Sequence, residues 1–352
     1  MLPFYIEAFA FFMETIFIGI YLYSWGKFKS KSAHLLTGIP IAVGGALSAM
    51  LITMINAWMN TPAGFNIQAF IQSGVVSGVM PFAVFHTQST WLEVVHVMFT
   101  AYFAGSLIIV AYACLMLLKS NEDRKRQYYK KWLAIMLPLA ALFTLLSIVT
   151  GIMSISAVAH WQPEKFAALE GNINPQSNAP ERIGGIPING TLKYYIPIPG
   201  FQSLLLNGST SGVVPGLSSY PKDTWPPLII HLMFDMLFGA AMLVGLIVAL
   251  ACAMYLFKWR PFENKLVLWL LILAGVLAAF ALEDGWVMEE LGRQPWIIYN
   301  VMLVSQAANG TPGIPIVAVL ILAFYLSVIP IVIFTVRRIF RGRPLFPEVQ
   351  TK

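Results

Sequence analysis

The stretch from residue 228 to residue 257 reads LIIHLMFDMLFGAAMLVGLIVALACAMYLF and decides the fold class. It is almost entirely apolar, and His231 and Asp235 both lie near its start. A helix rises about 1.5 Å per residue, so about 20 apolar residues cross the roughly 30 Å hydrocarbon core of a bilayer. This stretch predicts a transmembrane helix.

Six further runs have the same apolar character. The chain as a whole is 58% hydrophobic and 11% charged, whereas an average soluble domain is about 25% charged. No run alternates between polar and apolar residues as a barrel strand does. We therefore predict an all-α integral membrane protein, a bundle of about seven transmembrane helices. The six runs are 4–25, 35–58, 92–118, 132–157, 266–288 and 314–336.

The basic residues lie between the predicted helices, and most of the 22 Lys and Arg fall on one side of a seven-helix topology. The positive-inside rule makes that side cytoplasmic, with the N-terminus outside and the C-terminus in the cytoplasm. The net charge of +6 is thus explained by topology, and no nucleic-acid partner is predicted. The residues on this side are Lys27, Lys29, Lys31, Lys119, Arg124, Lys125, Arg126, Lys130, Lys131, Lys258, Arg260, Lys265, Arg337, Arg338, Arg341, Arg343 and Lys352.

Two outer connections are long, at 60–91 and 160–227. The second is rich in Gly, Pro, Asn and Ser, and it is either a binding segment or a solvated connector. It divides the chain into 1–159 with four helices, the loop itself, and 228–352 with three helices and a tail. Both cysteines lie inside hydrophobic runs, so we expect no disulfide and no covalently attached heme.

Ionisable side chains inside a bilayer cost about 2.5 to 3.5 kcal/mol each, which makes each one a functional candidate. In the predicted topology nearly all of them converge on the outer third of the bundle, across four helices. Structural polar residues scattered at random would not share one depth. The group comprises Glu7, Glu14, Glu93, His96, His231, Met233, Asp235, Glu283, Asp284, Glu289 and Glu290.

Three of these residues have donor atoms suited to heme iron. His96 and Met233 form a known axial pair for low-spin heme, although a membrane His is more often a hydrogen-bonding residue and a Met more often packs. Glu290 is a heme ligand, a proton relay, or the partner of Arg293 three residues on, and the residues alone favour the ion pair.

Two interpretations of Glu14 in the first helix are possible, and the sequence favours neither. It is either a carboxyl group capped by a neighbouring helix or part of a proton path, since acids and hydroxyls carry protons through membranes. Ser48 and Asn56 lie eight residues apart on one face of the second helix and extend such a path.

The segment 285–296, GWVMEELGRQPW, resembles the signature of subunit I of cytochrome bd-type quinol oxidases. The resemblance continues in AFFME at 10–14, NAWM at 56–59 followed by Pro62, and QPEK at 162–165, and it spans essentially the whole chain. It implies a quinol:oxygen oxidoreductase of the respiratory chain in the plasma membrane of a prokaryote.

The resemblance also implies roles for residues of the outer third. His96 and Met233 match the two axial ligands of the family's low-spin heme b. Glu290 matches the ligand of its high-spin heme b, with Trp286 and Arg293 in the catalytic surroundings. The third heme is heme d or another heme b.

The implied proton route to the oxygen-reducing heme uses Glu14, Ser48 and Asn56. Glu7 matches an acid beside that heme, with a spacing to Glu14 one residue shorter than the family pattern. The loop 160–227 corresponds to a short form of the family's quinol-binding loop, in which Lys193 is the candidate quinol contact.

One departure from the family concerns the first two of its nine helices, because this chain begins at what would be the third. The first family helix carries a His ligand of the oxygen-reducing heme. We expect a fragment, a split gene whose second chain supplies two helices and that His, or a divergent homologue, in that order. The expected partners are a second oxidase subunit, membrane quinol and oxygen.

Two rival interpretations remain. An ion-translocating transporter or channel would use the intramembrane acids as its path and would have helices broken near the membrane midplane. A non-catalytic subunit, or a heme b quinol-dehydrogenase-like subunit, would depend on a partner chain for activity.

Overall fold

The computed structural model describes residues 2–341. The chain divides after Val304 into two compact units, which are described separately. The first unit carries six of the long helices and all of the strands found in the described part of the chain.

Seven helices among residues 2–341 are long and apolar enough to cross a membrane, which confirms the predicted fold class. Most of them lie within a few residues of the predicted runs. The membrane helices are α1 (Leu2–Tyr23), α3 (Gly38–Asn60, preceded by α2, Lys31–Leu36), α5 (Thr90–Lys119), α6 (Asp123–Trp161), α9 (Ile229–Leu256), α10 (Lys265–Arg293) and α12 (Ile314–Arg341).

The main difference from the predicted boundaries is in α6, which begins at Asp123 instead of residue 132 and has 39 residues. At 1.5 Å per residue it is about 58 Å long, far more than the hydrocarbon thickness. Its extra turns carry the basic residues between Arg124 and Lys131, so they extend beyond the apolar layer. Pro138 lies inside α6 without ending it, and the other five membrane helices of the first unit are also continuous, contrary to the transporter interpretation.

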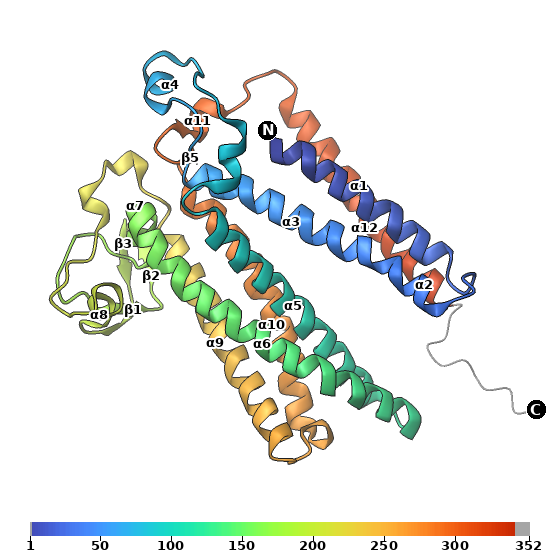
Figure 1. The fold of residues 1–352 in the computed structure, drawn as a ribbon. Helices are drawn as coiled ribbons and strands as arrows, with labels where there is room; N and C mark the ends of the chain where they lie inside the picture. The colour runs from blue at the N-terminus through green and yellow to red at the C-terminus, as the bar shows by residue number, and fades with distance from the viewer. Residues whose placement is uncertain (1, 342–352) are drawn as a thin grey trace, which may run out of the picture. The chain divides into compact units, whose positions relative to one another are not determined.

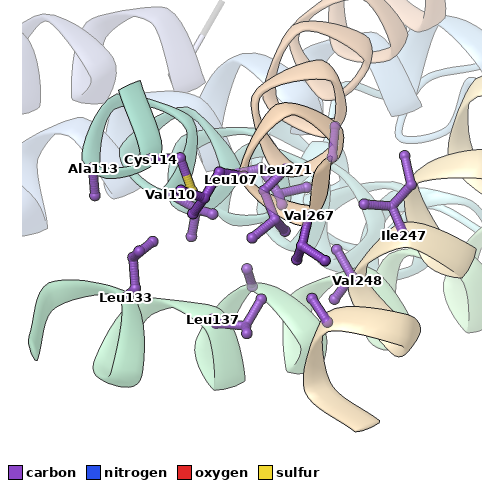
Figure 2. Close-up of a cluster of buried hydrophobic side chains, with 14 of the residues drawn as sticks. Leu107, Val110, Ala113, Cys114, Leu133, Leu137, Ile247, Val248, Val267 and Leu271 are labelled. Carbon is purple, nitrogen blue, oxygen red and sulfur yellow. The ribbon is translucent and has the colours of Figure 1, made fainter. Parts of the chain in front are cut away.

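Four helices, α5, α6, α9 and α10, form the central bundle (Figure 1). Helix α5 packs on α6 and α10, and α9 packs on α10 and α6. Figure 2 shows their shared core, in which Leu107, Leu133 and Leu271 are fully buried. In a membrane such a core is stabilised mainly by close packing. Gly275 makes this possible, because a Cβ atom there would lie 2.5 Å from the Cβ of Ala111.

Helix α1 lies against α3, and α3 in turn contacts α5. The α1 and α3 backbones approach closely at Gly44, where a Cβ atom would lie 2.9 Å from the carbonyl oxygen of Ala10 and 3.0 Å from the Cβ of Glu14. A small residue is required at this position because anything larger separates the two helices.

Most of the short elements between the helices gather at one end of the first unit, which we call the loop end (Figure 1). The connections α1–α2, α5–α6 and α9–α10 lie at the opposite, basic end, with the Lys and Arg residues of the first unit that were assigned to one side. The loop-end elements are α4 (Ile67–Ser73), η1 (Pro81–His86), α7 (Pro163–Leu169), β1 (Glu181–Ile183), β2 (Ile186–Ile188), β3 (Thr191–Lys193), β4 (Ile196–Ile198), α8 (Phe201–Asn207), η2 (Leu217–Ser219), η3 (Lys222–Thr224), β5 (Trp296–Ile298) and β6 (Met302–Leu303); η4 (Pro261–Glu263) lies at the basic end.

The strands form small antiparallel pairs. Strand β2 pairs with β3, and β1 pairs with β4 around them, so the segment 181–198 is a nested hairpin. Its turn is Asn189-Gly190, and both residues have positive φ, at 51° and 74°. Asn-Gly is the preferred pair for a two-residue turn of this kind. Strand β5 pairs with β6 just beyond α10.

The second unit contains α12 and the end of α11 (Val304–Ala307). Helix α12 contains Pro330 and continues through it. Nearly all of its described side chains are exposed and apolar, as expected for a membrane helix considered alone.

Candidate functional site

A cavity of about 280 Å³ lies within the bundle toward the loop end. This volume is close to the lower bound of small-molecule sites, roughly 300 Å³. Residues of α3, α5, α6, α7, α9 and α10 line it. Each long helix contributes a stripe at spacings of three or four, such as Glu93, His96 and Thr100 of α5. The wall is mostly apolar, with the polar groups concentrated toward the loop end.

His96 lines the cavity, and among the described residues only its Nδ1 atom has a hydrogen-bond partner. Its Nδ1 atom lies 2.9 Å from the Oγ1 of Thr150, whose hydroxyl donates to the carbonyl oxygen of Leu146 at 2.8 Å. The Thr150 oxygen therefore accepts, and Nδ1 carries the imidazole proton. This leaves the lone pair of Nε2 available. Metal-binding histidines are typically held in this way, with the second nitrogen donating to a fixed acceptor.

Lys165 and Glu289 form a buried ion pair in the cavity wall. The Nζ atom of Lys165 lies 2.6 Å from Oε2 of Glu289, and the lysine side chain is 3% exposed. Gly292 makes room for it, because a Cβ atom there would lie 2.8 Å from the Cε of Lys165. The sequence interpretation gave Lys165 no role. The available signal was its place at the start of α7, four residues beyond the end of α6.

Asn60 at the end of α3 joins three helices. Its Nδ2 atom lies 3.1 Å from Oε1 of Glu93, 2.8 Å from Oε1 of Glu289 and 3.1 Å from Oδ1 of Asn56. The Oδ1 atom of Asn60 is buried without a hydrogen-bond partner among the described residues. Of the polar residues predicted from topology to converge, Glu93 of α5 and Glu289 of α10 therefore meet here, through an amide of α3 that was not part of that prediction.

Glu290 is held by two neighbours. Asn56 Nδ2 donates to its Oε1 at 2.8 Å, and the guanidinium of Arg293 pairs with its Oε2. The ion pair favoured from the residues is thus formed, and the ligand role of Glu290 stays a prediction. Arg293 is 3% exposed, and its Nε and Nη1 atoms are among the described buried groups without a partner. Trp286 of the same helix lines the cavity.

The predicted proton-path residues lie on α3 or on the side of α1 that packs against it, at increasing distance from the basic end. Glu14 of α1 lies over Gly45, and Ser48 donates to Oε1 of Glu7 at 2.7 Å. Asn56 comes eight residues later, which is about 12 Å along the helix axis. No hydrogen bond among the described residues bridges that interval, so the structure brings Glu7 to Ser48 but leaves both separate from Asn56.

Two predicted residues lie away from the cavity wall. Met233 is half-buried on α9 and is not among the lining residues, whereas Met242 and Met288 are. Lys193 is exposed on β3, opposite Ile186 in the hairpin. Neither placement tests the predicted ligand or quinol role.

The loop 160–227 has a polar interior of its own. The buried carboxyl of Glu170 accepts from Nε2 of Gln202 at 2.8 Å, and Asn172 donates to Oε1 of Gln202 at 2.9 Å. Burial raises the pKa of Glu170 well above its ordinary value, and the nearby carboxylate of Glu181 adds to this. Burial also raises the pKa of Glu181. Arg182 contacts Asn172 and lies over the Tyr195 ring.

His231 anchors this loop to α9. Its Nδ1 lies 2.6 Å from the carbonyl oxygen of Leu169, and its Nε2 lies 2.9 Å from that of Gly184. The carboxylate of Asp235 accepts from the Gly184 amide at 2.5 Å. The loop is therefore a folded cap attached to the bundle, and its binding role stays a prediction.

The residues present fit a heme group. Heme needs an apolar pocket, an iron ligand and polar partners for its carboxylates, and the cavity offers apolar walls, the free Nε2 of His96 and the Lys165 side chain. The hydroxyls of Ser147 and Ser154 in the wall are buried and have no partner among the described residues. Such orphaned groups are expected where a bound group completes the site.

Fold and site together define a polytopic membrane protein with an imidazole-containing cofactor cavity near one end of its bundle. The chain belongs to the family "Cytochrome bd terminal oxidase subunit I", whose model matches residues 1–344. It is a subunit of a terminal quinol oxidase, a multi-pass membrane protein of a heme-binding, multi-subunit class.

Relatives support this assignment. The chain is 32% identical to a putative cytochrome bd menaquinol oxidase subunit I of Bacillus subtilis (strain 168), over 99% of this chain and 79% of the relative. It is 28% identical to cytochrome bd ubiquinol oxidase subunit 1 of the same organism, over 87% of this chain and 67% of that protein. The structure of the bd oxidase from Geobacillus thermodenitrificans matches with a TM-score of 0.84 and 33% identity, covering 97% of this chain and 78% of that one.

Proposed function

We propose that the chain is the heme-bearing subunit of a quinol:oxygen oxidoreductase that oxidises quinol at its loop end, on the outer face of the plasma membrane. This orientation places the basic end and the C-terminus in the cytoplasm. The relatives are named as menaquinol and ubiquinol oxidase subunits, which supports a quinol substrate.

The observation that carries the proposal is the free Nε2 of His96 in the cavity, fixed by the hydrogen bond from Nδ1 to Thr150. His96 would hold the iron of a low-spin heme b, with Met233 as the second ligand. Glu290 would hold a high-spin heme b, with Trp286 and Arg293 beside it. When bound, these groups supply one-electron transfer and oxygen reduction.

We further propose that the loop 160–227 is the quinol-binding segment. Lys193 stays a candidate contact in that loop. Lys165 has the better support of the two lysines, because its ammonium group lies in the cavity wall whereas Lys193 points to an exposed hairpin position. A buried cation beside an electron acceptor would orient a quinol oxygen or a heme carboxylate by charge-assisted hydrogen bonding.

Protons for oxygen reduction would come from the cytoplasmic side through Glu14, Ser48 and Asn56, with Glu7 close to the oxygen-reducing site. The hydrogen bond from Ser48 to Glu7 supports the middle of this route. The interval of about 12 Å between Ser48 and Asn56 needs water molecules or another chain to complete it.

The proposal includes a protein partner. A second oxidase subunit would pack against the apolar outer surface of the bundle. The third heme of the complex would be heme d or another heme b.

The test is a reduced-minus-oxidised spectrum of the purified complex with His96→Ala and, as a matched control, His160→Ala. His160 is exposed at the end of α6 and does not line the cavity. We expect the low-spin heme b band in the wild type and the control and its loss in His96→Ala. Absence of the band from the wild type would refute the function, and its retention in His96→Ala would refute the ligand.

A further inference from the structure

The cavity wall contains one carboxyl group that forms no ion pair with any described residue. Four of its described residues can carry charge: Glu93, His96, Lys165 and Glu289. Lys165 is paired with Glu289, while the ion pairs formed by the described residues do not include Glu93. An ionised carboxylate without a partner is costly in an apolar interior. Glu93 is therefore the group of this wall whose charge is least compensated.

The acceptor atoms that share the Asn60 amide next to Glu93 outnumber its N–H donors by one. An Asn side chain has two N–H donors, yet Nδ2 of Asn60 faces three acceptors, on Asn56, Glu93 and Glu289. The Oδ1 atom of Asn60 meanwhile receives no hydrogen bond from the described residues. Turning the amide over would place its oxygen against the three acceptors and enlarge the shortage. When Glu93 is protonated, its O–H group can supply the missing donor.

The position of Glu93 relative to His96 couples it to the proposed heme. The two residues lie three positions apart on α5 and both face the cavity, so they are separated by about 4.5 Å along the axis. No hydrogen bond or ion pair of the described residues joins Glu93 to His96 or to Glu290. The coupling is therefore electrostatic, through a low-dielectric cavity where charges interact strongly.

We propose that Glu93 takes up one proton when the heme held by His96 is reduced and releases it on reoxidation. The inference rests on the proposed function. The carboxylate of Glu93 would gain an O–H bond while one electron, supplied by quinol, enters the cavity, so the net charge of the cavity would stay constant. The proton comes from water at the loop end and returns there. Glu93 thus acts on the heme electrostatically, as a positioning residue, and does not bind the iron.

The other charged groups near Glu93 are already paired. Glu289 of α10 faces it with Lys165 of α7 as counter-ion, and beyond Asn56 lies the pair of Glu290 with Arg293. His96 on the same helix is committed to Thr150 through Nδ1. Glu93 is consequently the group of this cluster that can absorb an added negative charge.

The experiment measures the midpoint potential of the low-spin heme against pH by spectroelectrochemistry on the purified complex. The variants are Glu93→Gln, Glu93→Asp and the matched control Glu122→Gln, whose side chain is exposed at the basic end. One proton per electron lowers the potential by up to about 59 mV for each tenfold fall in proton concentration. We expect such a slope in the wild type and the control, and a slope at least twofold smaller in Glu93→Gln.

Glu93→Asp keeps a carboxyl group, so we expect its slope to persist with the bend of the profile shifted along the pH axis. This variant decides the matter if Glu93→Gln fails to assemble, since an unshifted profile would overturn the inference. Infrared difference spectra should show the C=O band of a protonated carboxyl in the reduced wild type and its loss in Glu93→Gln. A pH-independent wild type, or an unchanged slope in Glu93→Gln, would also overturn it. Absence of the heme band from the wild type would instead refute the proposed function.

Discussion

The ammonium group of Lys165 lies 2.6 Å from the carboxylate of Glu289, and the two residues connect the first turn of the loop-end cap to the last turn of a membrane helix. The pair closes one side of the cavity. The lysine side chain is 3% exposed and the glutamate side chain 27%, so the lysine in particular depends on its partner for its charge to be tolerated.

Lys165→Met is expected to destabilise the protein by about 3 to 5 kcal/mol, because it leaves the Glu289 carboxylate buried without a cation. The double variant Lys165→Met/Glu289→Gln should recover most of this loss. Thermal unfolding of the purified complex measures both. Lys130→Met, which breaks the more exposed pair with Glu263, is the control and should cost less than about 1 kcal/mol. A double variant no more stable than the single one would contradict the prediction.

The second axial ligand of the low-spin heme can be identified among three methionines. If Met233 is the ligand, Met233→Leu should convert the low-spin band to a high-spin one, because leucine offers no donor to iron. Met242→Leu and Met288→Leu, which alter thioethers that line the cavity, should leave the band unchanged. The reduced-minus-oxidised spectrum of each variant reports the outcome, and a loss confined to Met288→Leu or Met242→Leu would move the ligand to that residue.

The loop-end cap should become less stable as pH rises. Burial raises the pKa of Glu170 and Glu181 above the ordinary value of 4.5 in the folded state, so the folded protein binds more protons than the unfolded one above that pH. Stability is then fully present below 4.5 and falls as pH rises toward the folded pKa. Hydrogen exchange of 160–227, corrected for the intrinsic rate, measures this.

In the same experiment Glu170→Gln should flatten the pH dependence, because the amide keeps an acceptor for Gln202 but cannot ionise. Glu263→Gln at the basic end is the control. Lys130 lowers the pKa of Glu263, so its linkage has the opposite sign, and the cap should not respond to it. A cap whose protection rises with pH would show that burial of these carboxyls is not the governing effect.

Gly44→Ala is expected to cost about 1 to 3 kcal/mol, since the added methyl group would meet the backbone oxygen of Ala10 at 2.9 Å and must push α1 away from α3. Gly19→Ala on α1 is the matched control, because no atom lies within 4 Å of the methyl group it adds. The melting temperatures of the two variants give the comparison. Equal melting temperatures would show that α1 adjusts its position freely.

The fold could be predicted well from sequence because its signal is collective. Seven apolar runs of sufficient length leave little choice of architecture, and the basic residues between them set the order of the two ends. The start of α6 was missed for a physical reason. Residues such as Arg124 and Lys131 are unsuited to lipid but form good helix outside it, so hydropathy marks where the apolar layer ends and not where the helix ends.

The sequence predicts the level in the membrane at which the site lies, but it does not predict which side chains contact one another there. Topology placed Glu93, Glu289 and Glu290 at one level, and the structure brings them together through Asn60 and Asn56. An amide that links three helices carries no sequence signal of its own. The orientation of a helix about its own axis decides whether a lysine points into a cavity or toward water. The short helix that carries Lys165 has too few residues for its apolar pattern to show that orientation, so the sequence did not predict a role for this lysine.

The length of α6 has a consequence for energy conversion. Its cavity-lining residues begin at Thr144, thirteen positions after Lys131 at the basic end, which is about 20 Å along the axis. The hydrocarbon layer is roughly 30 Å thick, so a charge that travels from the basic end to the cavity crosses about two thirds of it. At roughly 2.3 kcal/mol per charge for each 100 mV, most of the work against the membrane potential would be done along this stretch of apolar helix.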